Sequence, residues 1–396
     1  MNVRGSADRR RDWRSPGTRN GFLGFVAFHI ITMLVAAASP NMTFLIVVRV
    51  FMGIALGGLR TVLFASWTEY VPSRDRGSWS SRASFIGNWS YPICSLIASF
   101  LVGVTSPEAN WRIQFIIPAI TSTIVLIIVW RLFPESPRWL ETKGRYREAN
   151  ELLDQIEAEV QRRNDITLEP AAAAVEAHAK VRGRVNLPYS ALFKGELLKR
   201  VIVGSFALIA MNVIQYTLIN WLPTMPLSQG IDLADSVVLN TMSMFGAPIG
   251  IFIAVFIIDR FPRRVFGIGL LLIIAALGYV YSLQMSMTAL SIVGFLLIIF
   301  VYMFVCFASA VYVPEIWPTA QKMRGLGIAN SIGRIVAIAS PYLVAWLLTE
   351  FGVIAVFMVL GLLLSACALV LAIFGIETRG RSVEEMALAI RTAKAA

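Results

Sequence analysis

The sequence predicts an all-α membrane protein in which ten helices cross the bilayer. Hydrophobic residues make up 57% of its 396 positions and charged residues only 15%, and the mean hydropathy is +0.69. A chain this apolar cannot be buried in one soluble core, and a bilayer is the solvent that suits it. Stretches of roughly 20 apolar residues satisfy their backbone hydrogen bonds in lipid as helices. Ten such stretches occur, at 22–38, 43–67, 84–104, 112–130, 201–222, 238–258, 265–284, 289–312, 327–348 and 353–375.

The basic residues lie in every second polar segment. Of the 35 Lys and Arg residues, 31 occur in these alternate segments. Cytoplasmic loops of membrane proteins are enriched in Lys and Arg, so we expect these segments and both ends of the chain to be cytoplasmic. We expect the protein in the inner or plasma membrane of the cell. Topology thereby explains the net charge of +11, and nucleic-acid binding is not expected. The basic segments are 1–21, 68–83, 131–200, 259–264, 313–326 and 376–396.

This topology divides the chain into five parts. Within the long central segment, Leu152, Leu153, Ile156 and Val160 share one helical face, which predicts a cytoplasmic amphipathic helix. The parts are a basic cytoplasmic tail at 1–21, a four-helix bundle at 22–130, a central cytoplasmic loop with short helices at 131–200, a six-helix bundle at 201–375 and a cytoplasmic tail at 376–396.

Residue types that perform catalysis or bind metals are sparse. The three cysteines, Cys94, Cys306 and Cys367, lie within predicted spans, where we expect no disulfide. His29 and His178 are far apart in sequence, and no glycine-rich phosphate loop accompanies them. We therefore expect no metal, no cofactor and no enzymatic activity.

The polar segments contain an internal repeat. Residues 69–77 follow the second span and residues 315–325 follow the eighth, and both read Glu-x-x-Pro and then Arg-Gly. Two spans after each comes a related run, Pro-Glu-Ser-Pro-Arg-Trp-Leu at 134–140 and Glu-Thr-Arg-Gly-Arg-Ser-Val-Glu-Glu at 377–385. Duplicated halves with a site between them are typical of membrane transporters.

Together these motifs resemble the major facilitator superfamily, specifically its sugar-porter-like and organic-acid/proton symporter branches. The family's Asp-Arg-x-Gly-Arg-Arg loop is matched at 259–264, with Pro262 in place of Gly, and a degenerate copy begins at Asp8. Residues 134–140 match the Pro-Glu-Ser-Pro-Arg-Trp-Leu motif throughout, and 377–385 resemble the family's terminal motif. The resemblance therefore covers nearly the whole chain.

The resemblance implies pseudo-twofold halves. The first four predicted spans correspond to family helices three to six, and the other six to helices seven to twelve, so the first half is expected to be two helices short. Family members move solutes by rocking the halves around a midplane site, usually with protons as the coupling ion.

Charged residues in the repeated cytoplasmic motifs are expected to form ion pairs that latch the halves when the cytoplasmic side closes. Single exposed pairs contribute only about 0–1 kcal/mol, so such a latch must be a network that exists in one state and not in the other. The alternative is that these charges only set the topology. The candidates are Glu69, Arg76, Glu135, Arg138, Asp259, Arg260, Arg263, Arg264, Glu315, Arg324 and Glu377.

Three arginines lie well inside predicted spans, where a charge costs on the order of 2.5–3.5 kcal/mol. Arg49 matches a family arginine that pairs with an acid on helix one, a partner not found here. Arg60 and Arg334, the latter one turn from Asn330, are candidate contacts for an anionic solute. Alternatively, either one snorkels or binds backbone carbonyls.

A polar stripe lies on the apolar span 201–222. Asn212, Gln215, Tyr216 and Asn220 fall in one sector of this helix, which suggests that they line a cavity. Hydrogen bonding between helices is the alternative. Sugar porters carry Gln-Gln-x-x-Gly-x-Asn here, which only Gln215 and Asn220 echo, so a hexose site is not favoured.

We expect secondary active transport of a small organic solute, an organic anion such as a carboxylate, by proton-coupled alternating access. Its partners are then the solute, membrane lipid and protons. The sequence does not indicate the oligomeric state. A sugar transporter is one alternative. The other is a non-transporting remnant that binds solute, because the first two family helices and an acid within the spans are missing.

Overall fold

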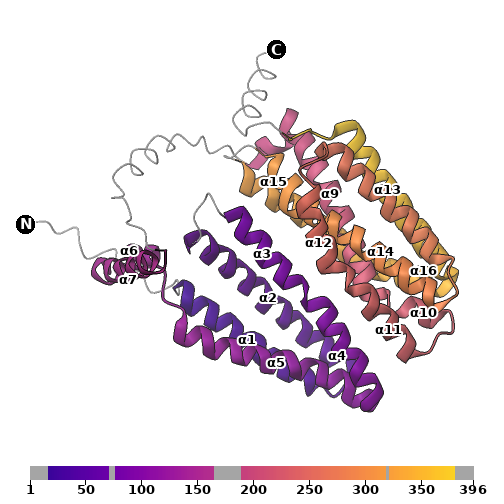
Figure 1. Ribbon diagram of the computed structural model, residues 1–396, viewed down its shortest axis with the longest axis horizontal. Coiled ribbons are helices and arrows are strands. Elements are labelled where there is room, and N and C mark those ends of the chain that lie inside the picture. Colours follow the sequence, from indigo (N-terminus) through magenta and orange to yellow (C-terminus); the bar gives the residue numbers. More distant parts are fainter. Residues whose placement is uncertain (1–16, 71–75, 165–188, 318–320, 380–396) are drawn as a thin grey trace, which may run out of the picture. The chain divides into compact units, whose positions relative to one another are not determined.

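The computed structural model describes residues 17–70, 76–164, 189–317 and 321–379, a few side chains within these ranges excepted (Figure 1). Every regular element in these ranges is a helix, and nine of the helices are long and apolar enough to cross a membrane. The ten predicted spans correspond to these nine helices with small differences at their ends, because the last helix, α16 (Lys322–Phe374), contains two spans. The prediction of an all-α membrane bundle is confirmed.

The two spans in α16 are separated by a glycine. Gly352 has φ 76° and ψ −174° in an otherwise helical chain. A residue with a Cβ rarely adopts this backbone conformation, so glycine allows the chain to reverse here. Two of the predicted spans therefore meet at a kink at Gly352.

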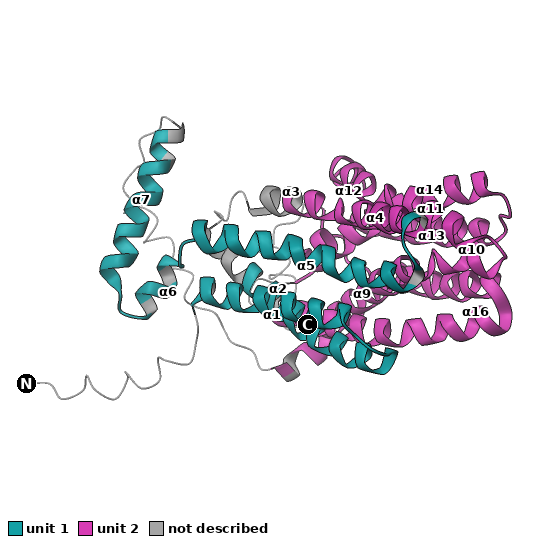
Figure 2. Ribbon diagram, turned by 90° about the horizontal axis from the view of Figure 1, so that it is seen from below, with its two compact units in different colours: residues 1–82, 104–180 teal, residues 83–103, 181–396 magenta. Residues whose placement is uncertain are grey.

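The contacts of the described residues divide the chain into two units (Figure 2). Unit 1 contains α1 (Thr18–Ala37), α2 (Met42–Tyr70), α5 (Pro107–Leu132), α6 (Pro137–Thr142) and α7 (Tyr146–Asn164). Helix α1 packs against both α2 and α5. A small apolar cluster of Ala36, Leu45 and Val48 fills the end where α1 meets α2.

Local signals position the helices of unit 1. Ser106 caps α5 by accepting a hydrogen bond from the Ala109 N–H at 3.4 Å, and Glu108 lies in the first turn. The guanidinium of Arg112 donates to the Ala37 carbonyl at 2.7 Å, which satisfies an acceptor at the end of α1. Helix α7 is the amphipathic helix that the sequence predicts in the central segment.

Unit 2 contains the remaining helices and the larger core. They are the last part of α3 (Arg76–Asn88), α4 (Ser90–Val104), η3 (Tyr189–Phe193), α9 (Gly195–Trp221), α10 (Thr224–Ser228), α11 (Leu233–Met244), α12 (Gly246–Ile257), α13 (Arg263–Ser282), α14 (Met287–Cys306), the π-helical η4 (Phe307–Tyr312), α15 (Val313–Glu315) and α16.

Small residues bring the helices of unit 2 close together. A Cβ at Gly246 would lie 2.7 Å from the Phe295 carbonyl oxygen, and one at Gly250 would collide with the Ile299 carbonyl. Gly333 of α16 likewise lies against the Leu208 carbonyl of α9. Backbones approach this closely only where side chains are absent, as is common between membrane helices.

The predicted four-helix and six-helix bundles stay a prediction. The sequence pattern places residues 84–104 in the first bundle, whereas the contacts of residues 83–103 group them with unit 2. The terminal tails fall largely outside the described residues, at 1–16 and 380–396.

Candidate functional site

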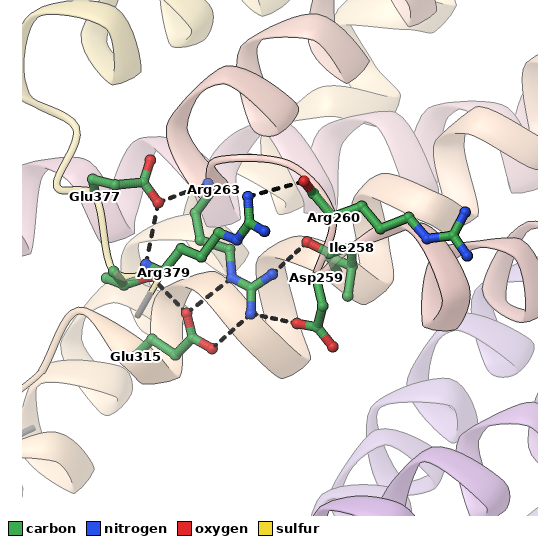
Figure 3. Close-up of polar contacts among 8 residues, drawn as sticks. Ile258, Asp259, Arg260, Arg263, Glu315, Glu377 and Arg379 are labelled. Carbon is green, nitrogen blue, oxygen red and sulfur yellow. Dashed lines mark hydrogen bonds and ion pairs between the residues drawn. The ribbon is translucent and has the colours of Figure 1, made fainter. Parts of the chain in front are cut away.

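Four predicted charged side chains of unit 2 meet in what we name the charge cluster: Asp259, Arg263, Glu315 and Glu377 (Figure 3). The Arg263 guanidinium donates to Asp259 Oδ1 at 2.7 Å and to Glu315 Oε2 at 3.2 Å. It also donates to the Ile258 carbonyl. The arginine is buried, and a buried guanidinium needs such partners for its charge and its donors.

Glu377 joins the charge cluster through backbone groups. Its two carboxylate oxygens accept hydrogen bonds from the N–H groups of Arg263 at 2.8 Å and Arg264 at 3.1 Å, the first two residues of α13. Burial by itself would raise the pKa of Glu377. These two hydrogen bonds and a third from the Arg379 N–H lower the pKa by more than burial raises it, so the pKa lies below its ordinary value. The carboxylate therefore caps α13.

The segment after α16 supplies two more contacts to the charge cluster. The Thr378 hydroxyl donates to Glu315 Oε2 at 2.6 Å, and the Arg379 guanidinium donates to the Arg260 carbonyl at 2.9 Å. The predicted residues Arg260 and Arg264 thus take part through their backbones. Three stretches far apart in sequence are held together here.

Unit 1 contains a counterpart of the Glu377 cap. Glu135 Oε1 accepts hydrogen bonds from the N–H groups of Arg19 at 2.9 Å and Ser136 at 3.1 Å, and Arg19 lies in the first turn of α1. A side chain at Gly17 would collide with this carboxylate. The repeated motifs at 134–140 and 377–385 therefore place a glutamate at equivalent helix starts.

The remaining predicted gating residues lie elsewhere or are not described. The Arg324 guanidinium lies over the Tyr189 ring of η3, 4.8 Å from its centroid. The side chains of Glu69, Arg76 and Arg138 are outside the described part of the chain. Whether the charges act as a latch stays a prediction.

The polar stripe on α9 is divided by the structure. Asn212 is buried and donates to the Leu208 carbonyl of its own helix at 2.8 Å, beside Gly333 of α16. The Gln215 amide instead donates to the Tyr91 hydroxyl of α4 at 3.4 Å. Tyr216 and Asn220 are exposed.

Two tyrosines that the sequence did not single out complete what we name the tyrosine–glutamine cluster: Tyr91, Gln215 and Tyr302. The rings of Tyr91 and Tyr302 meet edge to face, with centroids 5.3 Å apart. The Tyr302 hydroxyl is buried beside the Tyr91 and Gln215 side chains. A tyrosine in the apolar run of α14 was the only available signal, and tyrosines also occur in ordinary cores.

A second polar cluster in unit 2, also missed from the sequence, joins α4 to α11. We name it the hydroxyl cluster: Ser95, Asn240 and Thr241. The hydroxyls of Ser95 and Thr241 are 2.9 Å apart, and the Asn240 amide donates to the Ser95 hydroxyl at 3.0 Å. Both hydroxyl residues are buried.

The predicted arginine contacts for an anion are exposed. Arg334 and Asn330 are both exposed on α16 in unit 2, and Arg60 is exposed on α2 in unit 1. Two cavities, one in unit 1 and one in unit 2, have linings that do not include Arg334 or Gln215. One of about 400 Å³ borders Arg19 and Glu135, and another of about 370 Å³ borders Trp221. Among the residues described, no three His, Cys, Asp or Glu side chains converge on a metal site.

Residues 14–389 match the family model described as "Sugar (and other) transporter". The chain belongs to this family. The Escherichia coli (strain K12) protein YdjK is 57% identical over 94% of this chain and 80% of its own length. The "Inner membrane metabolite transport protein YdjE" of the same strain is 46% identical over 91% of this chain and 80% of its own length.

A solved structure has the same fold. The inward-open xylose transporter XylE from E. coli superimposes with a TM-score of 0.70 at 18% identity, covering 94% of this chain and 82% of that one. The resemblance to sugar-porter-like members of the major facilitator superfamily is confirmed. This chain is accordingly a multi-pass membrane transporter of a small solute and not an enzyme.

Proposed function

We propose that this transporter moves a small organic anion, a carboxylate, by proton-coupled alternating access. The observation that carries the proposal is the exposed Arg334 within an apolar helix. It lies seven residues, or roughly 10 Å, inside the predicted span 327–348. A charge facing lipid at such a depth costs several kcal/mol, so an exposed guanidinium there belongs in a water-filled cavity.

The neighbours of Arg334 support a solute site at this depth. Gly333, the preceding residue, lies against Leu208 and Asn212 of α9. Gln215 follows Asn212 by three residues, or roughly 4.5 Å along the helix axis, and binds Tyr91. A fixed cation and a hydrogen-bonding cluster therefore occur at similar levels of unit 2.

These groups have complementary tasks in binding a carboxylate. The planar guanidinium of Arg334 can donate two parallel hydrogen bonds to the two carboxylate oxygens, which gives both charge and orientation. The Gln215 amide and the Tyr91 hydroxyl can bind a polar group on the rest of the solute. The half-buried ring of Tyr91, which packs on the buried ring of Tyr302, offers an apolar surface beside them.

The charge cluster supports a gating role at the end of unit 2 where α13 begins. Arg263 has two carboxylate partners and Glu377 has three N–H donors in this state. A network of this kind favours one conformation only if its partners separate in the other. The alternation of basic segments supports placing this end, and both termini, on the cytoplasmic side of the inner membrane.

Uptake by the purified chain in proteoliposomes tests the solute class. We expect accumulation of one or more labelled carboxylates above empty vesicles and no saturable uptake of neutral pentoses or hexoses. Arg334→Gln should lower kcat/KM at least about tenfold, because one charge-assisted contact is worth about 1.5–3 kcal/mol. Arg131→Gln, at an exposed arginine near the end of α5, is the matched control. Saturable sugar uptake that Arg334→Gln leaves unchanged would overturn the anion assignment.

The coupling ion is tested in the same vesicles. An inwardly directed proton gradient should drive carboxylate accumulation, and a protonophore should collapse it to equilibration. Accumulation that ignores the pH gradient and follows a sodium gradient instead would contradict proton coupling. The Arg334→Gln comparison remains informative in either case, because it tests the solute and not the driving ion.

A further inference from the structure

The hydroxyl cluster is a continuous chain of hydrogen bonds between two helices. The Asn240 amide donates to the Ser95 hydroxyl, which can donate to Thr241 Oγ1 at 2.9 Å. The single hydrogen of the Thr241 hydroxyl has two carbonyl acceptors within reach, Val237 of its own helix at 2.8 Å and Ser95 of α4 at 3.1 Å. Ser95 and Thr241 are separated by 146 positions, so the chain of bonds joins parts that are distant in sequence. Successive hydrogen bonds of this kind strengthen one another in an apolar surrounding.

The hydroxyl cluster lies nearer to one face of the membrane than to the other, and its positions on the two spans agree on which face that is. Ser95 lies 7 residues before the end of the span Arg82–Val102, and Thr241 lies 8 residues after the start of the span Leu233–Ile257. At 1.5 Å per residue these positions are roughly 10–12 Å from one face and over 18 Å from the other. The alternation of basic segments makes the nearer face the outer one.

The hydroxyl cluster lies between the outer face and the candidate solute site. On α4, Tyr91 precedes Ser95 by four residues, which is one turn along the same helix face. Tyr91 belongs to the tyrosine–glutamine cluster, and Ser95 is one turn farther out. A solute held at Tyr91 and Gln215 would therefore lie deeper in the membrane than the Ser95–Thr241 contact.

The contacts nearer the other end of the same two spans have a different chemistry. Phe85 of α3 meets Phe252 of α12, with ring centroids 6.0 Å apart. Trp89, between α3 and α4, meets Phe245, between α11 and α12, with ring centroids 6.5 Å apart. Such apolar contacts tolerate sliding, whereas hydroxyl and amide groups at membrane depth lose a directed partner when they separate. The hydroxyl cluster therefore places directed bonds in the outer part of the contact.

We propose that Ser95, Thr241 and Asn240 form a hydrogen-bonded outer gate that keeps α4 and α11 together in this structure. The repeat assigns α4 to the first half of the chain and α11 to the second, so opening to the outside must separate them. This inference rests on the alternating access of the proposed function. It assigns these three residues to the conformational equilibrium and not to solute recognition.

Cysteine accessibility tests the gate without any solute. The reporter is Tyr216→Cys, an exposed position of α9, in a chain whose Cys94, Cys306 and Cys367 are replaced by alanine. A membrane-impermeant maleimide is applied to intact cells, and the labelling rate is measured. Combining Ser95→Ala with Thr241→Val should raise this rate about 3–10-fold, because the outward-open state gains population.

The chain offers matched controls for both substitutions. Among the described residues, the hydroxyls of Ser365 and Thr349 bind only carbonyls of their own helix, at Gly361 and at Ala345 and Trp346. Ser365→Ala combined with Thr349→Val removes the same atoms without breaking a contact between helices, and should leave the labelling rate unchanged. Ser95→Thr, which keeps a hydroxyl, should restore slow labelling.

Two outcomes would overturn the outer gate. One is a labelling rate for the Ser95→Ala, Thr241→Val protein equal to that of the matched controls. The other is faster labelling from the cytoplasmic face, measured in inside-out vesicles. Asn240→Ala removes one bond and both hydroxyls stay, so it provides a milder variant if the double substitution does not fold. The labelling assay needs no solute. A negative uptake result would therefore contradict the proposed solute, and a negative labelling result would contradict the outer gate.

Discussion

Glu377 accepts a hydrogen bond from the backbone N–H of Arg263 at 2.8 Å, so a carboxylate from beyond α16 closes the first turn of α13. Glu135 accepts from the Arg19 N–H at 2.9 Å in the first turn of α1. Unpaired N–H groups and the positive end of the helix dipole both favour a carboxylate at such a position. The internal repeat of the sequence therefore corresponds to a repeated helix cap.

Glu377→Gln should destabilise the folded protein by about 1 kcal/mol, the usual value of a helix cap together with its dipole interaction. The amide keeps one acceptor oxygen but loses the negative charge and the second acceptor for the N–H of Arg264. Thermal unfolding in detergent measures the change. Glu350→Gln, at an exposed glutamate of α16, is the control and should leave the midpoint unchanged. Equal shifts for both variants would contradict the cap.

The stabilisation by Glu377 should depend on pH in one direction. Burial raises its pKa, and hydrogen bonds from three backbone N–H groups lower it more, so the folded-state pKa is below the unfolded one. A group of this type stabilises the fold above its unfolded pKa of about 4.3 and loses the effect as pH falls through the lower folded value. The difference in unfolding midpoint between wild type and Glu377→Gln should thus be constant from pH 7 to about 5 and shrink below about 4. A difference that widens in acid would contradict this sign.

Hydropathy and the repeat predicted much of this molecule. Spans were predictable because lipid requires about 20 apolar residues in a helix, whatever their neighbours. Arg263 and Asp259 are four residues apart, and the repeated motifs also identified Glu315 and Glu377 as candidate members of a charge network. The joining of two spans at Gly352 was not predictable, because it depends on one backbone conformation.

The candidate solute site was only partly predictable. Helical periodicity places Asn212 and Gln215 in one sector, but it does not say which neighbour each one meets. Asn212 bonds its own helix, whereas Gln215 reaches Tyr91. Ser95 and Thr241 carry no local signal at all, because a single hydroxyl in an apolar span usually bonds a carbonyl one turn back. Pairing over such sequence distances is a property of tertiary packing.

Tyr91→Phe should raise the KM for the transported solute about 2–10-fold, because one neutral hydrogen bond contributes roughly 0.5–1.5 kcal/mol. The substitution removes the acceptor for the Gln215 amide but keeps the ring against Tyr302. Initial uptake rates over a range of solute concentrations give KM and kcat separately. Tyr279→Phe, at an exposed tyrosine of α13, is the control. An unchanged KM for Tyr91→Phe would remove this hydroxyl from the site.

Gly250→Ala should destabilise the packing of α12 on α14 by about 1–3 kcal/mol, the usual cost of inserting a methyl group into a filled contact. The new Cβ would collide with the Ile299 carbonyl, which belongs to the backbone and cannot rotate away. Thermal unfolding in detergent gives the shift.

Gly269→Ala provides the opposite case for the same measurement. Apart from the neighbouring backbone of its own helix, no atom lies within 4 Å of the position of its Cβ. The main expected effect is the gain in helix propensity, and the midpoint should stay or rise slightly. If both glycines tolerated alanine equally, the close approach of α12 and α14 would not limit stability. A loss confined to Gly250→Ala would mean that backbone contact, and not helix propensity, decides the role of glycine in this bundle.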